Sequence, residues 1–204
     1  MELQDALAQL SEIRLHVART EPFRGYRAAT SAFSAFVAIV TAAVQAVVVP
    51  DPAADPHAYL LLWIVAAIFC VAVTALEMVV RCRCSLSPTA GRMTWLAVEQ
   101  FLPCTIAGAV LTFVLAVSAP ASIWMLPGLW GMLFSLGIFA SGRLLPRPII
   151  WVAWYYLACG ALSLALAQGV HAFSPWAMGV AFGGGQCLTA VVLYITLERQ
   201  HDGQ

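Results

Sequence analysis

Long apolar segments alternate with short polar connections along the 204-residue chain. Each apolar segment has about 20 residues, which is enough for a helix to cross a hydrocarbon core of roughly 30 Å. Lipid offers no partner to backbone groups, and the segments lack the in–out alternation of barrel strands, so we predict transmembrane helices. The predicted spans are residues 28–49, 58–80, 95–117, 121–140, 148–168 and 174–196.

This pattern predicts an all-α integral membrane protein in three parts. A cytoplasmic amphipathic helix covers residues 1–27, a domain of six transmembrane helices covers 28–197, and a cytoplasmic tail covers 198–204. The first apolar run is too long for the h-region of a signal peptide, so we expect a retained span. Composition agrees, because 62% of the residues are hydrophobic and 10% are charged, against about 25% charged in soluble domains.

The amino-terminal segment has the spacing of an amphipathic helix. Its apolar residues recur at steps of three and four positions; they are Leu3, Ala6, Leu10, Ile13 and Val17. Such a helix packs beneath its own bundle, lies at the membrane surface or pairs with a helix of a partner. Its mixed charge disfavours the membrane surface, which attracts polar faces rich in Lys and Arg.

The basic residues predict the orientation. All of them are arginines, and a six-span arrangement places them on one side of the membrane, while Asp51 and Asp55 lie on the other. The positive-inside rule makes the arginine side cytoplasmic, with both termini there. The formal net charge of +0 gives no reason to expect a nucleic-acid partner. The arginines are Arg14, Arg19, Arg24, Arg27, Arg81, Arg83, Arg92, Arg143, Arg147 and Arg199.

Tryptophans fall near both ends of the predicted spans. This distribution is typical of an aromatic belt that anchors helices at the two membrane surfaces. Trp63, Trp124 and Trp176 mark the outer side, and Trp95, Trp151 and Trp154 mark the inner side.

Two carboxylates lie inside predicted spans, where an ionisable group is costly and therefore worth a functional hypothesis. Glu77 precedes Arg81 by four residues, the favourable acid-before-base spacing on a helix. We expect these two residues to form a structural ion pair near the cytoplasmic surface.

Glu99 lies in the stretch WLAVEQFLPC, residues 95–104. Pro103 has no amide hydrogen, so the carbonyl of Glu99 loses its helical partner and we expect a kink. Glu99, Gln100 and Thr105 then form a candidate polar intramembrane site for a cation or a proton. The alternative is that Glu99 pairs with an arginine and Pro103 only bends the span.

Glycines interrupt the sixth span. Gly179 and Gly183 form a GxxxG pair, which lets a second helix approach closely, and Gly184 and Gly185 follow. Helix packing or dimerisation is one interpretation, with Pro103 as a further packing residue in the third span. The alternative is a locally broken helix that exposes Gln186 to a cavity near the midplane, as in carriers.

Cysteine and histidine patterns predict no cofactor and no metal. Cys70, Cys104, Cys159 and Cys187 lie near mid-depth, where cysteine packs as a small hydrophobe; they would bind a soft metal only if their helices faced inward. Cys82 and Cys84 lie in a predicted cytoplasmic loop, a reducing environment. The sequence holds no hydrolase triad order, zinc signature or phosphate loop, so it predicts no catalytic residue.

Three stretches resemble a known group of proteins: residues 13–27, residues 86–92, and Pro127 through Gly137 in the fourth span. They are similar to a loose group of uncharacterised six-span bacterial inner-membrane proteins. The resemblance implies a multi-pass protein of the bacterial inner (plasma) membrane. It also implies a regulatory partner, since members of the group tend to be encoded beside small winged-helix regulators.

Three functions stay open at this point. The first is a non-enzymatic sensory or regulatory protein that recognises an apolar or membrane-borne signal and faces a cytoplasmic partner through its amino-terminal helix. The second is a small transporter or channel in which Glu99, Gln100 and Gln186 converge between spans three and six. The third is a membrane redox or soft-metal protein. Lipid is the expected surrounding in each case, and a homo-oligomer is an open alternative to a monomer.

Overall fold

The computed structural model describes residues 28–84, 88–142, 144–166 and 172–198. These residues contain six helices that are long and apolar enough to cross a membrane, as the sequence predicts, and no strand. The predicted amino-terminal helix and carboxy-terminal tail lie outside the described residues. The candidate spans are Ala28–Val48, Pro56–Val80, Val98–Ser118, Pro120–Ser141, Ile149–Leu166 and Pro175–Thr196.

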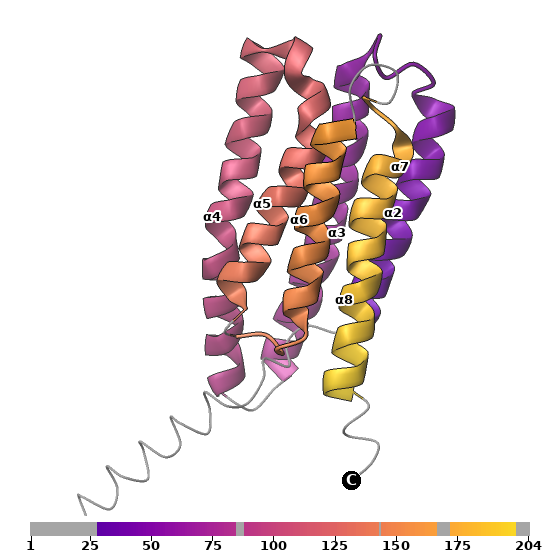
Figure 1. The fold of residues 1–204 in the computed structure, drawn as a ribbon. Coiled ribbons are helices and arrows are strands. Elements are labelled where there is room, and N and C mark those ends of the chain that lie inside the picture. The colour runs from indigo at the N-terminus through magenta and orange to yellow at the C-terminus, as the bar shows by residue number, and fades with distance from the viewer. Residues whose placement is uncertain (1–27, 85–87, 143, 167–171, 199–204) are drawn as a thin grey trace, which may run out of the picture.

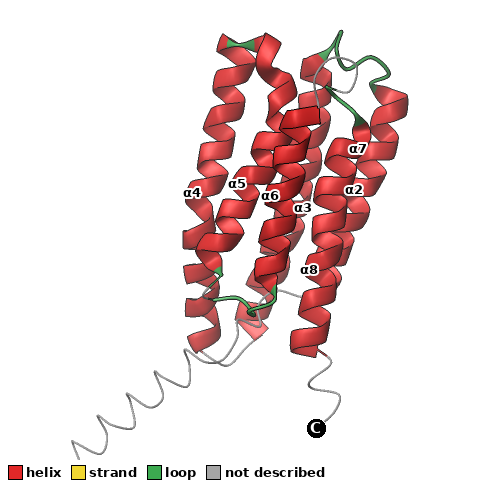
Figure 2. Cartoon of the chain, in the orientation of Figure 1, coloured by secondary structure: helices red, strands yellow, loops and turns green. Residues whose placement is uncertain are grey.

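The helices run up and down the bundle, with short connections between neighbours in sequence (Figures 1 and 2). The elements are α2 (Ala28–Val48), α3 (Pro56–Cys84), α4 (Pro88–Ser118), η1 (Pro120–Met125), α5 (Leu126–Ser141), α6 (Ile149–Leu166), α7 (Pro175–Met178), η3 (Gly179–Gly184), α8 (Gly185–Leu193) and η4 (Tyr194–Glu198). Packing joins α3 to α4, α4 to α5, α5 to α6, α6 to α8, α8 to α2, and α2 back to α3. The six spans therefore close into a ring.

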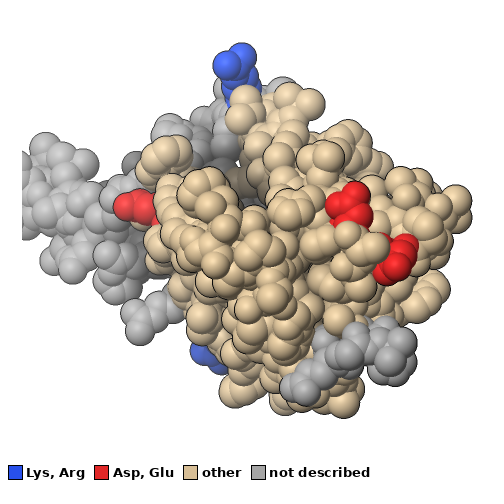
Figure 3. Space-filling model, turned by 90° about the horizontal axis from the view of Figure 1, so that it is seen from above, with Lys and Arg blue, Asp and Glu red and all other residues tan. Residues whose placement is uncertain are grey.

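The two ends of the bundle differ in charge. The upper end, as drawn in Figure 1, carries residues 49–55, Ala119 and residues 172–174; the lower end carries the α5–α6 connection and the first and last described residues. Seen from above, most of the surface is uncharged, with acidic groups on two opposite sides and basic groups at the margins (Figure 3). Asp51 and Asp55 belong to the upper connection between α2 and α3. The backbone positions of Arg81, Arg83, Arg92 and Arg147 belong to the lower end. These four arginines thus share one end, as the sequence predicts, and the other six lie outside the described residues.

Some helix ends differ from the prediction. Helix α3 continues to Cys84 and α4 starts at Pro88, so Cys82 and Cys84 lie on the last turn of a helix and not in a loop. Residues 81–84 contain no proline or glycine, so these polar residues can continue α3 beyond its apolar run. Pro88 is the first residue of α4, a position where proline is tolerated. Helix α4 also continues through Pro103.

The fourth and sixth spans are not uniform α-helices. The fourth begins as the 3₁₀ helix η1, whose end is marked by the amide of Leu126 donating to the carbonyl of Ile123; the next residue, Pro127, has no amide to donate. In the sixth span, η3 and η4 are π-helical and α7 and α8 are α-helical. Apolar length predicts a span but does not predict these changes of winding.

Small and hydroxyl side chains form the buried face of α2, whereas its larger apolar side chains point outward. This distribution suits a helix in lipid, because lipid solvates large apolar groups and small residues let helices approach closely. The buried residues of α2 are Ala28, Thr30, Ser31, Ser34, Ala35, Ala38, Thr41, Ala42 and Gln45.

Glycines make the closest helix contact, between α5 and α6. A Cβ atom added at Gly160 would lie 2.7 Å from the carbonyl oxygen of Gly128 and 2.9 Å from the amide nitrogen of Met132. A Cβ at Gly131 would lie 3.3 Å from the Cα of Gly160. The backbones therefore touch, and only glycine fits at position 160.

Candidate functional site

Helix α4 exposes the polar residues that the sequence predicts as a site. The side chains of Glu99, Gln100 and Thr105 are all exposed. The hydroxyl of Thr105 lies 3.4 Å from the carbonyl oxygen of Phe101 in its own helix, which is a long separation for a hydrogen bond. These three side chains lie at the periphery of the chain and not in its buried core.

Gln186, the fourth predicted site residue, lies on α8 and is half-buried. Its Oε1 atom is buried and has no hydrogen-bond partner among the described residues. Helix α8 packs mainly on α2 and α6, whereas α4 packs mainly on α5 and η1. The two parts of the predicted site therefore lie on helices with different main neighbours.

Glu77 is half-buried on α3 and takes part in an interaction. The side chain of its expected partner, Arg81, lies outside the described residues. The predicted ion pair stays a prediction.

The glycines of the sixth span lie against two other helices. A Cβ at Gly179 would lie 2.8 Å from the Cβ of Ala42, and one at Gly183 would lie 2.9 Å from Cγ1 of Ile39, both on α2. A Cβ at Gly184 would collide with the hydroxyl of Tyr155, and one at Gly185 with the ring of Tyr156, both on α6. The four glycines thus let one helix pack between α2 and α6.

The cysteines do not assemble a metal site in the part of the chain that the structure describes. Cys70, Cys104, Cys159 and Cys187 are free and come from four different helices. No three His, Cys, Asp or Glu side chains come together there to hold a metal ion.

A buried hydrogen-bond network at the upper end was not predicted from the sequence. Its centre is Gln45 of α2, whose side chain is 0% exposed. Oε1 of Gln45 accepts a 2.9 Å hydrogen bond from Nε1 of Trp63 on α3, and Nε2 donates a 2.9 Å bond to the carbonyl oxygen of Phe173. One amide thus connects α2, α3 and the segment before α7.

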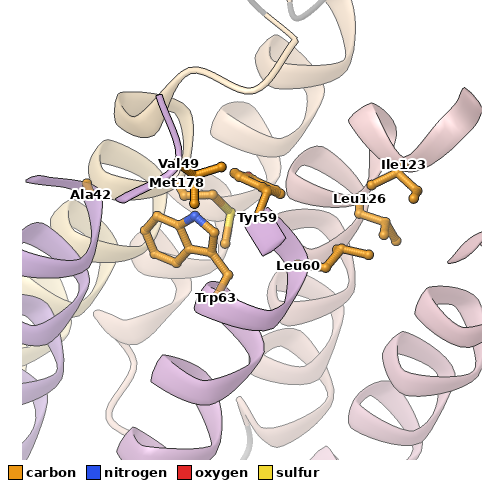
Figure 4. Close-up of a cluster of buried hydrophobic side chains, with 8 residues drawn as sticks. All are labelled: Ala42, Val49, Tyr59, Leu60, Trp63, Ile123, Leu126 and Met178. Atoms are coloured by element: carbon orange, nitrogen blue, oxygen red, sulfur yellow. The ribbon is translucent and has the colours of Figure 1, made fainter. Parts of the chain in front are cut away.

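An apolar cluster surrounds this network (Figure 4). Tyr59, Trp63 and Met178 lie together on one side of the upper end of α3, and Leu60 faces Ile123 and Leu126 on the other (Figure 4). The ring of Tyr59 meets the ring of Phe173 edge-on, with centroids 5.1 Å apart. The Tyr59 side chain is 0% exposed, and its hydroxyl has no hydrogen-bond partner among the described residues.

A cavity opens at the upper end beside this cluster. Its volume is about 560 Å³, and it is open to the outside and not enclosed. The described residues that line it are uncharged: Ala53, Pro56, Pro120, Ala121, Trp124, Ala172 and Phe173. Phe173 therefore belongs to the cavity wall and also accepts the hydrogen bond of Gln45.

One residue of the sequence indicated this network, but it is uncharged and the charged residues drew attention elsewhere. Gln45 is the one amide side chain in the first span, whose other polar residues carry hydroxyls, and buried polar groups in lipid need partners. Trp63 is 4% exposed, so its interpretation as a belt residue was wrong: the indole points into the bundle to bond Gln45. Trp95, Trp151, Trp154 and Trp176 are exposed.

Comparisons with protein-family models, with curated proteins and with solved structures found no match to the chain.

Proposed function

We propose that the chain is a non-enzymatic sensory protein of a bacterial inner membrane, which binds an uncharged, largely apolar small molecule in the upper cavity. In this proposal the upper end faces outward and both termini are cytoplasmic, following the arginines of the lower end. The cavity is lined by alanine, proline and aromatic side chains, a surface that favours apolar ligands. A flat aromatic ring could stack on Trp124 or Phe173.

The role of Phe173 is the observation that carries the proposal. Phe173 belongs to the cavity lining, and its backbone carbonyl accepts the hydrogen bond from Gln45 of α2. A ligand that displaces Phe173 also strains this part-buried bond to α2, whose lower end follows the amino-terminal segment. This gives a physical route from the cavity to residues 1–27, which we propose as the surface for a cytoplasmic protein partner.

The test is a thermal-stability screen of the full chain in detergent. The panel contains uncharged aromatic and amphipathic compounds such as phenols, indole, quinones and short alkanols, with charged analogues beside them. A compound that binds only the folded protein stabilises it by about 2.7 kcal/mol at a hundred times its dissociation constant. We expect uncharged compounds to raise the unfolding temperature of the wild type and to lose that effect in Trp124→Ala.

Trp176→Ala is the matched control, because Trp176 is exposed and does not line the cavity. It should keep the response of the wild type. Equal responses of the two variants, or no response to any compound in the panel, would count against a cavity receptor.

The second candidate is a small transporter with a polar site between spans three and six. It is favoured by the buried Oε1 of Gln186, which has no hydrogen-bond partner among the described residues. Such an atom is costly in lipid unless a ligand or water occupies the space beside it. Proton or cation flux into proteoliposomes, present in the wild type and lost in both Gln186→Leu and Glu99→Gln, would support it. Flux no greater than that of empty liposomes would exclude it.

A further inference from the structure

The sixth span changes its winding in the middle of the bundle. Residues Gly179–Gly184 are π-helical, between the α-helical α7 and α8. A π-helical turn holds more residues than an α-helical turn and is found mostly as a short insertion at functional positions. It therefore changes the rotation of α8 about the helix axis relative to α7, compared with one continuous α-helix.

The hydroxyl of Tyr155 on α6 forms a hydrogen bond with the backbone of this turn. It donates a 2.6 Å hydrogen bond to the carbonyl oxygen of Val180. The amide of Gly185, the residue after this turn, donates to the carbonyls of Ala181 and Phe182. The tyrosine supplies a partner to a carbonyl at the point where the winding changes, which lipid cannot do.

Gly184 makes room for this bond. A Cβ atom at position 184 would collide with the Tyr155 hydroxyl. The tyrosine oxygen thus lies against bare backbone, and its position depends on a glycine beside it.

The alternative winding of this turn is an ordinary α-helix. In that register the amide of Gly184, four residues on, would donate to the carbonyl of Val180, which the Tyr155 hydroxyl now bonds. The chain beyond the turn would then be rotated by about 100° relative to the chain before it. The two registers therefore differ in how α7 faces α8.

The buried residues of α7 and α8 indicate which of the two helices would rotate. Helix α8 is fixed by Thr189, Ala190 and Leu193, all buried. Helix α7 has four residues, of which Met178 is buried. Rotating α7 displaces fewer buried side chains than rotating α8.

We propose that Gly179–Gly184 is a two-state hinge, in which the Tyr155–Val180 hydrogen bond sets the π register and its loss lets α7 rotate against α8. The proposal goes beyond ligand sensing and does not depend on what the upper cavity binds.

The test measures distances between spin labels carried by ketone-bearing unnatural amino acids, so that the native cysteines stay in place. Labels at Trp176 on α7 and Val191 on α8 are each paired with a label at Val40 on α2; all three positions are exposed. In Tyr155→Phe, which keeps the ring and removes the donor, we expect the 176–40 distance to shift by on the order of 5 Å. The 191–40 distance should stay as in the wild type.

Thr74→Val is the matched control, because it removes a hydroxyl that bonds the carbonyl of Cys70 within its own helix, α3, and it should leave both distances unchanged. A second variant deletes Gly184, which lets α7 and α8 join as one α-helix without rotating either. When Tyr155→Phe is added to this deletion variant, it should have no further effect on the distances. Unchanged distances in Tyr155→Phe, equal shifts of both pairs, or the same Tyr155→Phe shift in the deletion variant would overturn the hinge.

Discussion

Nε1 of Trp63 donates a 2.9 Å hydrogen bond to Oε1 of Gln45, and both side chains are buried. Trp63→Phe keeps an aromatic ring but leaves the Gln45 oxygen without its donor. An unpaired buried polar group costs about 1–3 kcal/mol, so we expect the free energy of unfolding to fall by about that amount. Equilibrium unfolding in detergent measures it.

A double-mutant cycle separates this hydrogen bond from lost packing. Gln45→Leu alone also destabilises, because it leaves the Trp63 donor and the Phe173 carbonyl unpaired. The two substitutions together should cost less than the sum of their separate effects, with a coupling of about 0.5–3 kcal/mol. Strict additivity would show that the two side chains do not support each other.

Tyr59→Phe should have the opposite sign. The Tyr59 hydroxyl is buried and has no hydrogen-bond partner among the described residues, so its removal ends a desolvation cost and leaves the ring contact with Phe173 in place. We expect unchanged or higher stability, by up to about 1 kcal/mol. A marked loss of stability in the same assay would reveal a partner of this hydroxyl, such as a bound water.

Gly160→Ala and Gly108→Ala are a matched pair. The new methyl at 160 would lie 2.7 Å from the backbone oxygen of Gly128, whereas the one at 108 would lie 3.7 Å from Cδ1 of Leu133. Overpacking costs about 1–3 kcal/mol, while alanine in an open helical position gains about 1 kcal/mol in propensity. Unfolding temperatures should therefore fall for Gly160→Ala and stay level or rise for Gly108→Ala.

Similar effects of the two alanines would contradict close packing of α5 on α6. The contrast is informative because both positions lie in predicted spans and both substitutions add the same methyl group.

Glu99→Gln should change stability by no more than about 0.5 kcal/mol, because its side chain is exposed at the lower end of its candidate span. Thermal unfolding across a series of pH values and cations measures this. A larger loss would favour Glu99 as an ion-pair partner, and a cation-dependent shift that Glu99→Gln abolishes would favour the transporter.

The six spans could be predicted because apolar length and arginine placement are properties of the sequence alone. The changes of winding could not, since they depend on partners far along the chain. The π turn at Gly179–Gly184 accepts a hydrogen bond from Tyr155, a residue of the preceding span. The four glycines at positions 179 and 183–185 indicated close packing or a break, but not which helix would lie against them.

The candidate site was harder to predict for a related reason. Charge drew attention to Glu99, which is exposed, while the uncharged Gln45 forms the buried network. In lipid a neutral amide that bonds two other segments is as informative as a carboxylate, but its partners lie 18 and 128 positions away in the sequence. Periodicity within one helix cannot identify such partners.

The most direct test of the proposed receptor is the labelling of Ala53→Cys, at the wall of the upper cavity, with a membrane-impermeant maleimide in intact cells. The wild-type chain gives the background from native cysteines. We predict labelling without permeabilisation, slowed by the uncharged compounds that stabilise the purified protein. Labelling only after permeabilisation, or a rate that none of those compounds changes, would contradict an outward-facing ligand cavity.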